Sequence, residues 1–331
     1  MRRAANPPKL GGEAAGGRGV ADEVGVEVWA GGVNTWECDE MGHLNVRFYV
    51  AKAMEGLAGL AAELGMPQAF SPEADSTLVV REQHIRFLRE ARPNAVLAMT
   101  GSVVEMGESE ARLLLVMRHL SGEPAATFQV LVSHATSGTG AAFPWPQRIR
   151  DRAAALTAPV PAYAAARSLA PTPATASTAS LARADELGLV HTGQGAVGPQ
   201  DCDVFGRMRA ELFMGRISDG IRRLVGETRP GSEPGRDGAA PRIGGAALEY
   251  RLAYFAWPRA GDRLALRSAT TWTDARFRRL VHWLLDPATG RPWAAAEAIT
   301  ASFDLDARKI VTLSPRALAA VEAQVIPGLE L

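Results

Sequence analysis

One segment of this chain occurs twice, and the two copies align without a gap. Residues 36–56 read WECDEMGHLNVRFYVAKAMEG, and residues 200–220 read QDCDVFGRMRAELFMGRISDG. A repeat spacing longer than about 50 residues is not that of a solenoid unit, so it indicates a duplicated domain. The chain of 331 residues is long enough for two domains that each bury a core. At a constant offset of 164 residues the copies share Cys38 and Cys202, Asp39 and Asp203, Gly42 and Gly206, and Gly56 and Gly220.

Each half of the chain shows the same predicted order of elements: a strand, the repeated motif and a helix, followed by a run of strands. The first helix is predicted from Asn45 to Leu64, because Gly65 and Pro67 form a stop signal. Its apolar residues cover more than one face, which is typical of a buried helix. The helix of the second half is predicted at 208–225. The strands, marked by β-branched and alternating residues, are predicted at 24–36, 76–90, 95–106, 111–120 and 125–135, and at 191–198, 246–257, 262–272, 277–286 and 292–305.

These elements predict an α+β fold in which each half is an antiparallel sheet wrapped around a long central helix. Such a sheet leaves one edge and the far side of its helix uncovered. Two copies in one chain can cover each other, so we expect an intrachain pseudo-dimer with an approximate twofold axis. Whether the whole chain dimerises further is left open.

Changes in composition along the chain predict the domain boundaries. The Gly-, Ala- and Pro-rich N-terminal tail, residues 1–22, is expected to be disordered. The first domain is expected at 23–143 and the second at 186–313. Between them, residues 144–185 are rich in Ala and Pro, which predicts a linker running over the surface. Residues 314–331 form a C-terminal tail with a short helix.

The composition also excludes several classes of function. The chain is 47% apolar and 22% charged, as in soluble globular proteins, and its formal net charge is zero. We therefore expect neither a nucleic-acid groove nor a surface for acidic membranes. No apolar stretch reaches the roughly 18 residues that a membrane span needs. The two cysteines, one in each copy, exclude a disulfide framework and fit a reducing cytoplasm.

The first copy of the motif carries a pattern with chemical meaning. The segment Asp39-Glu-Met-Gly42-His43-Leu-Asn45 is followed by the aromatic pair 48–49 on the predicted helix. It resembles the D-x-x-G-H-x-N motif of the hotdog-fold thioesterases, which hydrolyse acyl-coenzyme A (acyl-CoA) or acyl-carrier-protein (acyl-ACP) thioesters. The resemblance covers both halves and their order of strands. It implies a tandem double hotdog, similar to 4-hydroxybenzoyl-CoA-thioesterase-like proteins and to the plant acyl-ACP thioesterases.

The resemblance implies catalytic roles for Asp39, His43 and Asn45. In the family the matching Asp either activates water or attacks the thioester directly, and thioester hydrolysis needs such a base or nucleophile. His43 is expected to orient the acyl carbonyl or to tune Asp39, and Asn45 to hold the loop or the attacking water. The alternative is that Asp39 and Asn45 serve only as turn and helix-capping residues, since both residue types favour those positions.

A second set of residues is expected to bind the substrate. The N–H groups around Gly42, His43 and Leu44 precede a helix N-terminus, so we expect them to form an oxyanion site. Tyr49, at the start of the helix, is expected to contact the substrate. The carrier arm is expected to enter past arginines such as Arg86, Arg89 and Arg92.

The second copy of the motif is incomplete. It keeps Asp203 and Gly206, but Arg207 and Arg209 stand where the first copy has His and Asn. A purely structural His would be kept in both copies, so we expect one working site, in the first motif. The alternative is a second site formed by Asp203, Gly206 and Arg207, in which the two arginines bind an anionic part of the substrate.

Glu55 is a further candidate, because some hotdog thioesterases use a carboxylate on the helix. Lys52 lies three residues before Glu55, and Arg216 lies three residues before Asp219. Both copies thus keep a basic residue and an acidic residue at i and i+3, which favours an intrahelical ion pair over a catalytic role.

The sequence therefore predicts an acyl thioester hydrolase that acts on acyl-CoA or acyl-ACP without a cofactor. The acyl group is expected to lie along the buried helix, in the cleft between the halves. Two alternatives remain: a hotdog enoyl-thioester hydratase or dehydratase, and a non-catalytic acyl-CoA-binding module. No metal site is expected, because Cys38, Asp39 and His43 lack the spacing of metal ligands.

Overall fold

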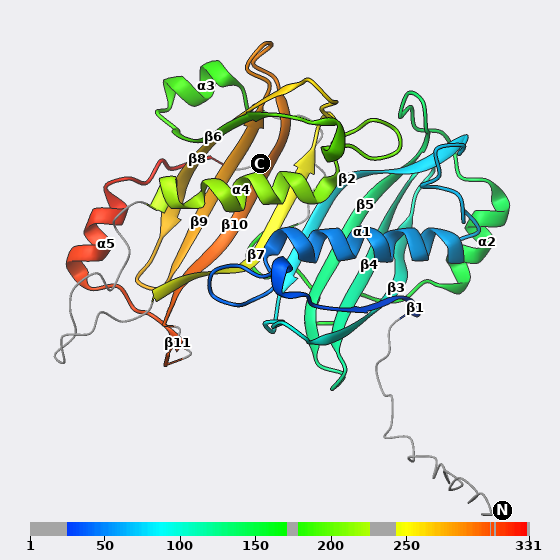
Figure 1. Cartoon of the computed structure of the whole chain (residues 1–331), viewed down its shortest axis with the longest axis horizontal. Helices are drawn as coiled ribbons and strands as arrows, with labels where there is room; N and C mark the ends of the chain where they lie inside the picture. The colour runs from blue at the N-terminus through cyan, green and yellow to red at the C-terminus, as the bar shows by residue number, and fades with distance from the viewer. Residues whose placement is uncertain (1–24, 171–177, 226–242, 305, 308, 330–331) are drawn as a thin grey trace, which may run out of the picture.

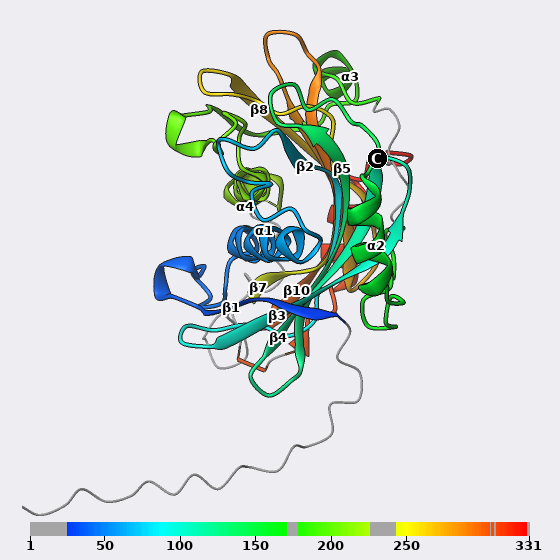
Figure 2. The same cartoon turned by 90° about the vertical axis from the view of Figure 1, so that its right-hand side faces the viewer.

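The two halves join in one curved antiparallel sheet that carries two long helices on its concave face (Figures 1 and 2). The computed structural model describes residues 25–170, 178–225, 243–304, 306–307 and 309–329. The strands follow the order β1-β3-β4-β5-β2-β7-β10-β9-β8-β6, and β11 pairs with β10. The expected α+β tandem double hotdog is confirmed. The predicted N-terminal tail and the loop at 226–242 lie outside the described residues.

The first half agrees closely with the predicted order of elements. Its long helix, α1, begins and ends within one or two residues of its predicted bounds. A short 3₁₀-helix, η1, lies between the first strand and the motif loop. The elements are β1 (Val26–Gly32), η1 (Thr35–Glu37), α1 (Val46–Glu63), β2 (Ser76–Phe87), β3 (Val96–Met106), β4 (Glu110–His119) and β5 (Pro124–Thr136).

The second half repeats this order around α4. Its elements are β6 (Val190–Ala196), η2 (Pro199–Asp201), α4 (Ala210–Val225), β7 (Ile243–Tyr254), β8 (Arg263–Thr273), β9 (Phe277–Leu285), β10 (Pro292–Asp304), β11 (Lys309–Ile310) and α5 (Pro315–Glu322). The last of these is the short helix predicted in the C-terminal tail. The strand β11 was not predicted, because two residues carry no readable pattern.

Local signals fix both ends of α1. Asn45 is its N-cap, and the Asn45 side chain accepts a hydrogen bond from the Arg47 N–H. At the other end Gly65 has φ 87°, a left-handed conformation that glycine adopts without strain. Between these ends the helix buries residues such as Val50 and Leu57 against the sheet. Because Asn45 is both the last residue of the motif and the N-cap of α1, packing of the helix also fixes the end of the motif loop.

The two halves meet along β2 and β7, which pair antiparallel from Glu82 opposite Ala253 to Arg86 opposite Glu249. On the concave face α1 and α4 pack side by side, stacked one above the other in Figure 2. The predicted intrachain pseudo-dimer is confirmed, and each half covers the edge that the other would expose.

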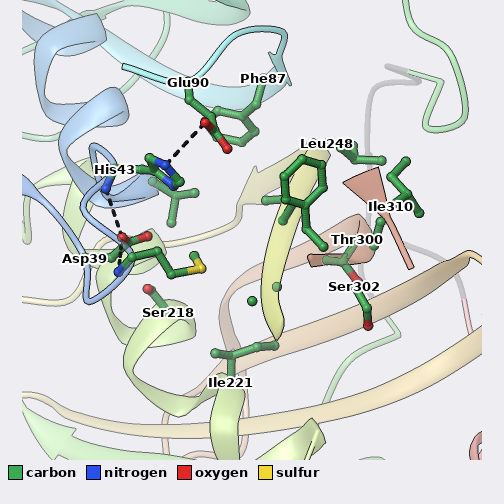
Figure 3. A pocket seen from close by; sticks show the side chains of 18 of the residues that line it. Asp39, His43, Phe87, Glu90, Ser218, Ile221, Leu248, Thr300, Ser302 and Ile310 are labelled. Atoms are coloured by element: carbon green, nitrogen blue, oxygen red, sulfur yellow. Dashed lines mark hydrogen bonds and ion pairs between the residues drawn. The ribbon is translucent and has the colours of Figure 1, made fainter. Parts of the chain in front are cut away.

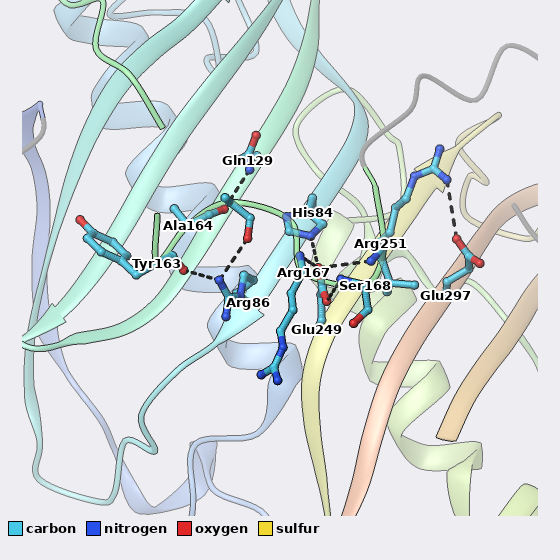
Figure 4. A network of polar contacts seen from close by, with 12 residues as sticks. His84, Arg86, Gln129, Tyr163, Ala164, Arg167, Ser168, Glu249, Arg251 and Glu297 are labelled. Carbon is cyan, nitrogen blue, oxygen red and sulfur yellow. Dashed lines mark hydrogen bonds and ion pairs between the residues drawn. The ribbon is translucent and has the colours of Figure 1, made fainter. Parts of the chain in front are cut away.

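The segment expected to be a surface linker has a structural role. It contains α2 (Gln147–Ala155) and α3 (Leu181–Glu186), and its middle part crosses the outer face of the sheet over the junction of the halves (Figure 4). The N–H groups of Arg167 and Ser168 each donate to a carboxylate oxygen of Glu249 at 2.9 Å. This part of the segment between the domains is thus hydrogen-bonded to a strand of the second half. Ala- and Pro-rich composition does not reveal contacts that the backbone makes with distant strands.

No helix in the described part of the chain is both long and apolar enough to cross a membrane.

Candidate active site

The first motif borders a cavity of about 1060 Å³ that extends into the second half of the chain. Its walls come from the loop at 39–45, from the C-terminal half of α4, and from β7, β9, β10 and β11. Such a volume is at the upper end for small-molecule sites. Asp203, Gly206 and Arg207 of the second motif are not among the lining residues. The cavity thus joins the complete motif of one half to the sheet and helix of the other (Figure 3).

Asp39 holds the motif loop closed with one of its two carboxylate oxygens. Its Oδ1 accepts hydrogen bonds from the N–H groups of Met41, at 2.9 Å, and His43, at 3.1 Å (Figure 3). The turn passes through Gly42, whose φ of 75° is left-handed. The other oxygen, Oδ2, has no hydrogen-bond partner in the described part of the chain. Asp39 is therefore a turn residue, as the alternative reading expected, with a second oxygen left for chemistry at the cavity wall.

The N–H groups expected to form the oxyanion site are occupied. Gly42 donates to the Asp39 carbonyl, His43 donates to Asp39 Oδ1, and Leu44 donates to the Ala91 carbonyl. The predicted oxyanion site at these three residues is therefore wrong, because the loop uses its own donors to close. Among the described residues the N–H of Val46, the first residue of α1, has no partner, and Val46 lines the cavity. It lies at the positive end of the helix dipole, where an N–H group favours a negative charge.

His43 and Tyr49 both line the cavity, with different polar partners. His43 Nε2 lies 3.3 Å from Glu90 Oε2. Glu90 can orient the imidazole, and sequence reasoning missed it because no spacing relates it to the motif. The Tyr49 hydroxyl accepts from the Ala91 N–H at 3.1 Å, and burial raises the pKa of Tyr49 far above its usual range. Tyr49 thus forms a wall of the cavity, edge-on to the Phe87 ring.

Asn45 connects the two halves at the site. Its Oδ1 caps α1, while its Nδ2 donates to Ser218 Oγ on α4 at 3.2 Å. Ser218 also lines the cavity, as does its neighbour Asp219. Both polar atoms of the Asn45 side chain are therefore used to hold α1 and α4 in place. Residues of the second half form part of the wall of the cavity at the first motif.

The second motif forms the same turn, but its aspartate also binds an arginine side chain. Asp203 Oδ1 accepts from the N–H groups of Phe205 and Arg207, each at 2.9 Å. Asp203 Oδ2 is bonded to Arg207 Nε at 3.2 Å. Arg209 pairs with Glu211 at 3.2 Å. Both arginines thus have partners within the chain, and Arg207 occupies the oxygen that is open in Asp39.

Glu55 lies on an exposed face of α1 and is not among the cavity residues. Its Oε2 accepts from Trp29 Nε1 at 2.6 Å. The predicted intrahelical ion pair is wrong, because Lys52 Nζ binds Glu37 Oε1 at 2.8 Å instead.

The second half repeats this exchange of partners, with Arg216 lying 3.7 Å from Asp201. Both copies therefore use the basic residue of the helix to fasten the 3₁₀-helix that precedes the motif. The i,i+3 spacing of Lys52 and Glu55 therefore does not reflect an ion pair, because each side chain has a different partner: Glu37 for Lys52 and Trp29 for Glu55.

The three arginines expected at the entrance do not act together. Arg86 lies on the outer face, where it donates to the carbonyls of Tyr163 and Ala165 (Figure 4). Arg89 and Arg92 line the cavity, and Arg89 pairs with Glu123. The expectation is wrong for Arg86, because the alternation along β2 points its side chain away from the cavity.

The chain was compared with known sequence families and solved structures. The profile described as Thioesterase-like superfamily matches residues 33–153 and again residues 197–321. A search of curated proteins found no match.

Three of the similar solved structures span nearly the whole fold. A putative oleoyl thioesterase from Lactobacillus plantarum has 11% identity and a TM-score of 0.62, and covers 88% of this chain and 98% of its own. An acyl-ACP thioesterase from Bacteroides thetaiotaomicron has 12% identity and a TM-score of 0.58, with 82% and 96% covered. A 12:0-ACP thioesterase from Umbellularia californica has 12% identity and a TM-score of 0.59, with 83% and 93% covered.

At these identities the solved structures show a shared fold. The sequence profile matches twice and covers both halves, including both copies of the motif. The chain belongs to the thioesterase-like hotdog superfamily and contains two tandem copies of its domain.

Proposed function

We propose that this protein hydrolyses acyl thioesters carried on coenzyme A or on an acyl-carrier protein, at a single site in the first motif. The main observation behind the proposal is the hydrogen bonding of the two carboxylate oxygens of Asp39. One oxygen is spent on closing the loop, and the other is without a partner in the described chain, beside a cavity large enough for an acyl group. The acyl-ACP thioesterases among the similar structures support this substrate class.

In this proposal Asp39 supplies the base or the nucleophile. Its Oδ2 either takes a proton from the attacking water or attacks the thioester carbonyl carbon itself. The carbonyl oxygen becomes negative as the bond forms, and the Val46 N–H at the start of α1 is the donor placed to stabilise it. His43, oriented by Glu90, donates to the same oxygen or to the leaving sulfur. The C–S bond breaks and the thiol leaves; if Asp39 is the nucleophile, water then cleaves the acyl anhydride on Asp39, so that in both cases the products are a free acid and a free thiol.

The test is turnover of a panel of acyl-CoA and acyl-ACP substrates by the full-length protein. Release of thiol with stoichiometric release of the free acid supports hydrolysis. Water addition to an enoyl thioester without thiol release would instead identify a hydratase. Saturable binding with neither reaction would identify an acyl-CoA-binding module, and either of these results would overturn the proposal.

A further inference from the structure

The wall of the cavity opposite Asp39 carries hydroxyl groups among its apolar residues. Figure 3 shows Asp39, His43 and Glu90 on one side of the cavity and Thr300 and Ser302 on the other. An acyl group that ends in a methyl would favour an apolar end, because burying hydroxyl and charged groups against a hydrocarbon loses their hydration. The polar residues in this wall therefore favour an acyl group with a polar end over one that ends in a methyl group.

Arg278 on β9 is a charged residue of this wall. It lines the cavity and lies directly opposite Thr300 on β10 in the strand register. Its Nη2 is buried, and the guanidinium makes no hydrogen bond or ion pair with any described residue. Burial lowers the pKa of Arg278 below its usual value. A guanidinium partly withdrawn from water without an anion is unfavourable, and a bound anion would offset that cost.

Among the described residues, no acidic side chain forms an ion pair with Arg278. Asp274, which also lines the cavity, uses its Oδ1 to accept the N–H groups of Arg276 and Phe277 in the β8–β9 turn. Asp219 lines the cavity from α4 and forms no ion pair with Arg278. Within the described part of the chain, the positive charge of Arg278 at the cavity wall therefore has no anionic partner.

The equivalent positions in the first half of the chain are occupied by apolar core residues. The strand register identifies the counterparts of Arg278 and Thr300 in the first half. The row of paired residues Glu82–Leu131–Arg112 in the first half corresponds to Glu249–Ile299–Arg279 in the second. In the next row, Ala111 therefore corresponds to Arg278 and Val132 to Thr300. Ala111 and Val132 are 2% and 0% exposed and belong to the apolar core. The fold therefore accepts small apolar residues here, so the arginine is not required by packing.

We propose that Arg278, with the hydroxyl groups of Thr300 and Ser302, binds a carboxylate at the far end of the acyl group. The natural substrate is then the thioester of a dicarboxylic acid, held by its thioester carbonyl at Asp39 and by its second carboxylate at Arg278. This proposal rests on the proposed thioesterase function. A guanidinium binds carboxylate and phosphate equally well, so the phosphates of the carrier are the other source of such an anion.

The test compares pairs of thioesters of equal chain length whose acyl groups end in either a methyl or a carboxylate. Each pair is prepared both as CoA esters and as N-acetylcysteamine esters, which lack phosphate. The proposal expects the wild-type protein to prefer the carboxylate-ended member in both carriers, by about tenfold or more in kcat/KM at the best length. Arg278→Ala, which installs the residue of the first half, should remove this preference and leave turnover of the methyl-ended esters unchanged.

Arg276→Ala is the matched control, because Arg276 also lines the cavity but is exposed and lies over the Phe277 ring. It should keep the preference. A loss for all CoA esters in Arg278→Ala, with N-acetylcysteamine esters unaffected, would assign Arg278 to the carrier phosphates and overturn the proposal. Hydrolysis without any carboxylate preference at any length would also overturn it, while leaving the thioesterase function intact.

A binding measurement separates this proposal from the reaction. Calorimetric titration of wild-type protein with free dicarboxylic acids and with monocarboxylic acids of equal length needs no turnover. Tighter binding of the diacid that is lost in Arg278→Ala supports the subsite even if no thioester is hydrolysed, in which case the proposed function alone has failed. Equal binding of the two acids by wild type and variant would overturn the subsite.

Discussion

The two aspartates of the repeat, Asp39 and Asp203, close their loops with the same pair of backbone hydrogen bonds. They differ at the second carboxylate oxygen, which is bonded to Arg207 in the second copy and is without a partner in the described chain in the first. The comparison within one chain shows that both aspartates share a structural role and that only Asp39 keeps a carboxylate oxygen without a described partner. The sequence pointed to this difference through the His-to-Arg replacement, but not to the Arg207–Asp203 contact that results from it.

Asp39→Asn should reduce turnover by about a hundredfold or more without unfolding the protein. An amide oxygen can still accept the N–H groups of Met41 and His43, so the loop stays closed, while the basic oxygen is lost. Steady-state kinetics on the best acyl thioester, with circular dichroism to check the fold, measure this. Asp203→Asn is the matched control and should keep most of the activity. Comparable kinetic losses in the two variants, at comparable stability, would contradict a single working site.

At the scale of the elements, prediction succeeded where the signal is local. Asn45 and Gly65 mark the ends of α1, and alternating apolar residues mark the strands, because capping and side-chain alternation depend on neighbours in sequence. Prediction failed where a residue chooses between a near and a distant partner. Lys52 was assigned to Glu55, but folding brings Glu37 closer to it in space.

The pair of Lys52 and Glu37 should contribute to stability more than its counterpart does. Their side chains are 7% and 11% exposed, and Lys52→Met would leave the Glu37 carboxylate nearly buried without its cation, at a cost of about 3 kcal/mol. Arg216→Met is the matched control: its contact with Asp201 is longer and more exposed, and should be worth less than about 1 kcal/mol. Urea unfolding of both variants measures the difference. Equal losses would show that the tighter pair has no special role.

The same pair predicts a dependence on pH. Burial alone would raise the pKa of Glu37, but hydrogen bonds from Asn34 and Lys52 outweigh it and hold the pKa below its usual value of 4.5. A carboxyl group with a lowered pKa in the folded state stabilises the protein above its unfolded pKa, and this contribution is lost as the pH falls through the folded value. Glu37→Gln should therefore destabilise the protein at neutral pH and much less at about pH 3. Unfolding free energies of wild type and variant at the two pH values test this, and a constant difference would contradict it.

The whole molecule is held together by a buried polar network at the junction of its halves (Figure 4). His84 Nε2 lies 2.7 Å from Glu249 Oε1, and Arg251 Nη2 lies 3.0 Å from Glu82 Oε2. These two contacts are counterparts under the pseudo-twofold relation, since His84 and Arg251 face each other in the β2–β7 register. The segment between the domains closes over this network through Glu249. None of this was predictable from the repeat, because the partners of these side chains are set by how the halves dock.

Because the network joins both halves, its loss should destabilise them together. Arg251→Met would remove the cation shared by the buried carboxylates of Glu82 and Glu297, which are 1% and 4% exposed, and would leave Glu82 only its longer contact with Arg112 at 3.5 Å. The expected cost is about 3–5 kcal/mol, as for other broken buried pairs. Arg291→Met is the control, since Arg291 is exposed and should change stability by less than about 0.5 kcal/mol.

The measurement is urea unfolding followed by both circular dichroism and tryptophan fluorescence, because each half contains tryptophans, Trp29 and Trp145 in the first and Trp257 and Trp283 in the second. One coincident transition is expected for wild type, displaced to lower urea in Arg251→Met, because neither half can keep its junction strand covered when the other unfolds. Two separated transitions, with Arg251→Met moving one of them, would show that the halves fold independently and that the junction holds together two stable domains. The proposed site, built from the loop of one half and the walls of the other, would then open by separation of the halves without unfolding either of them.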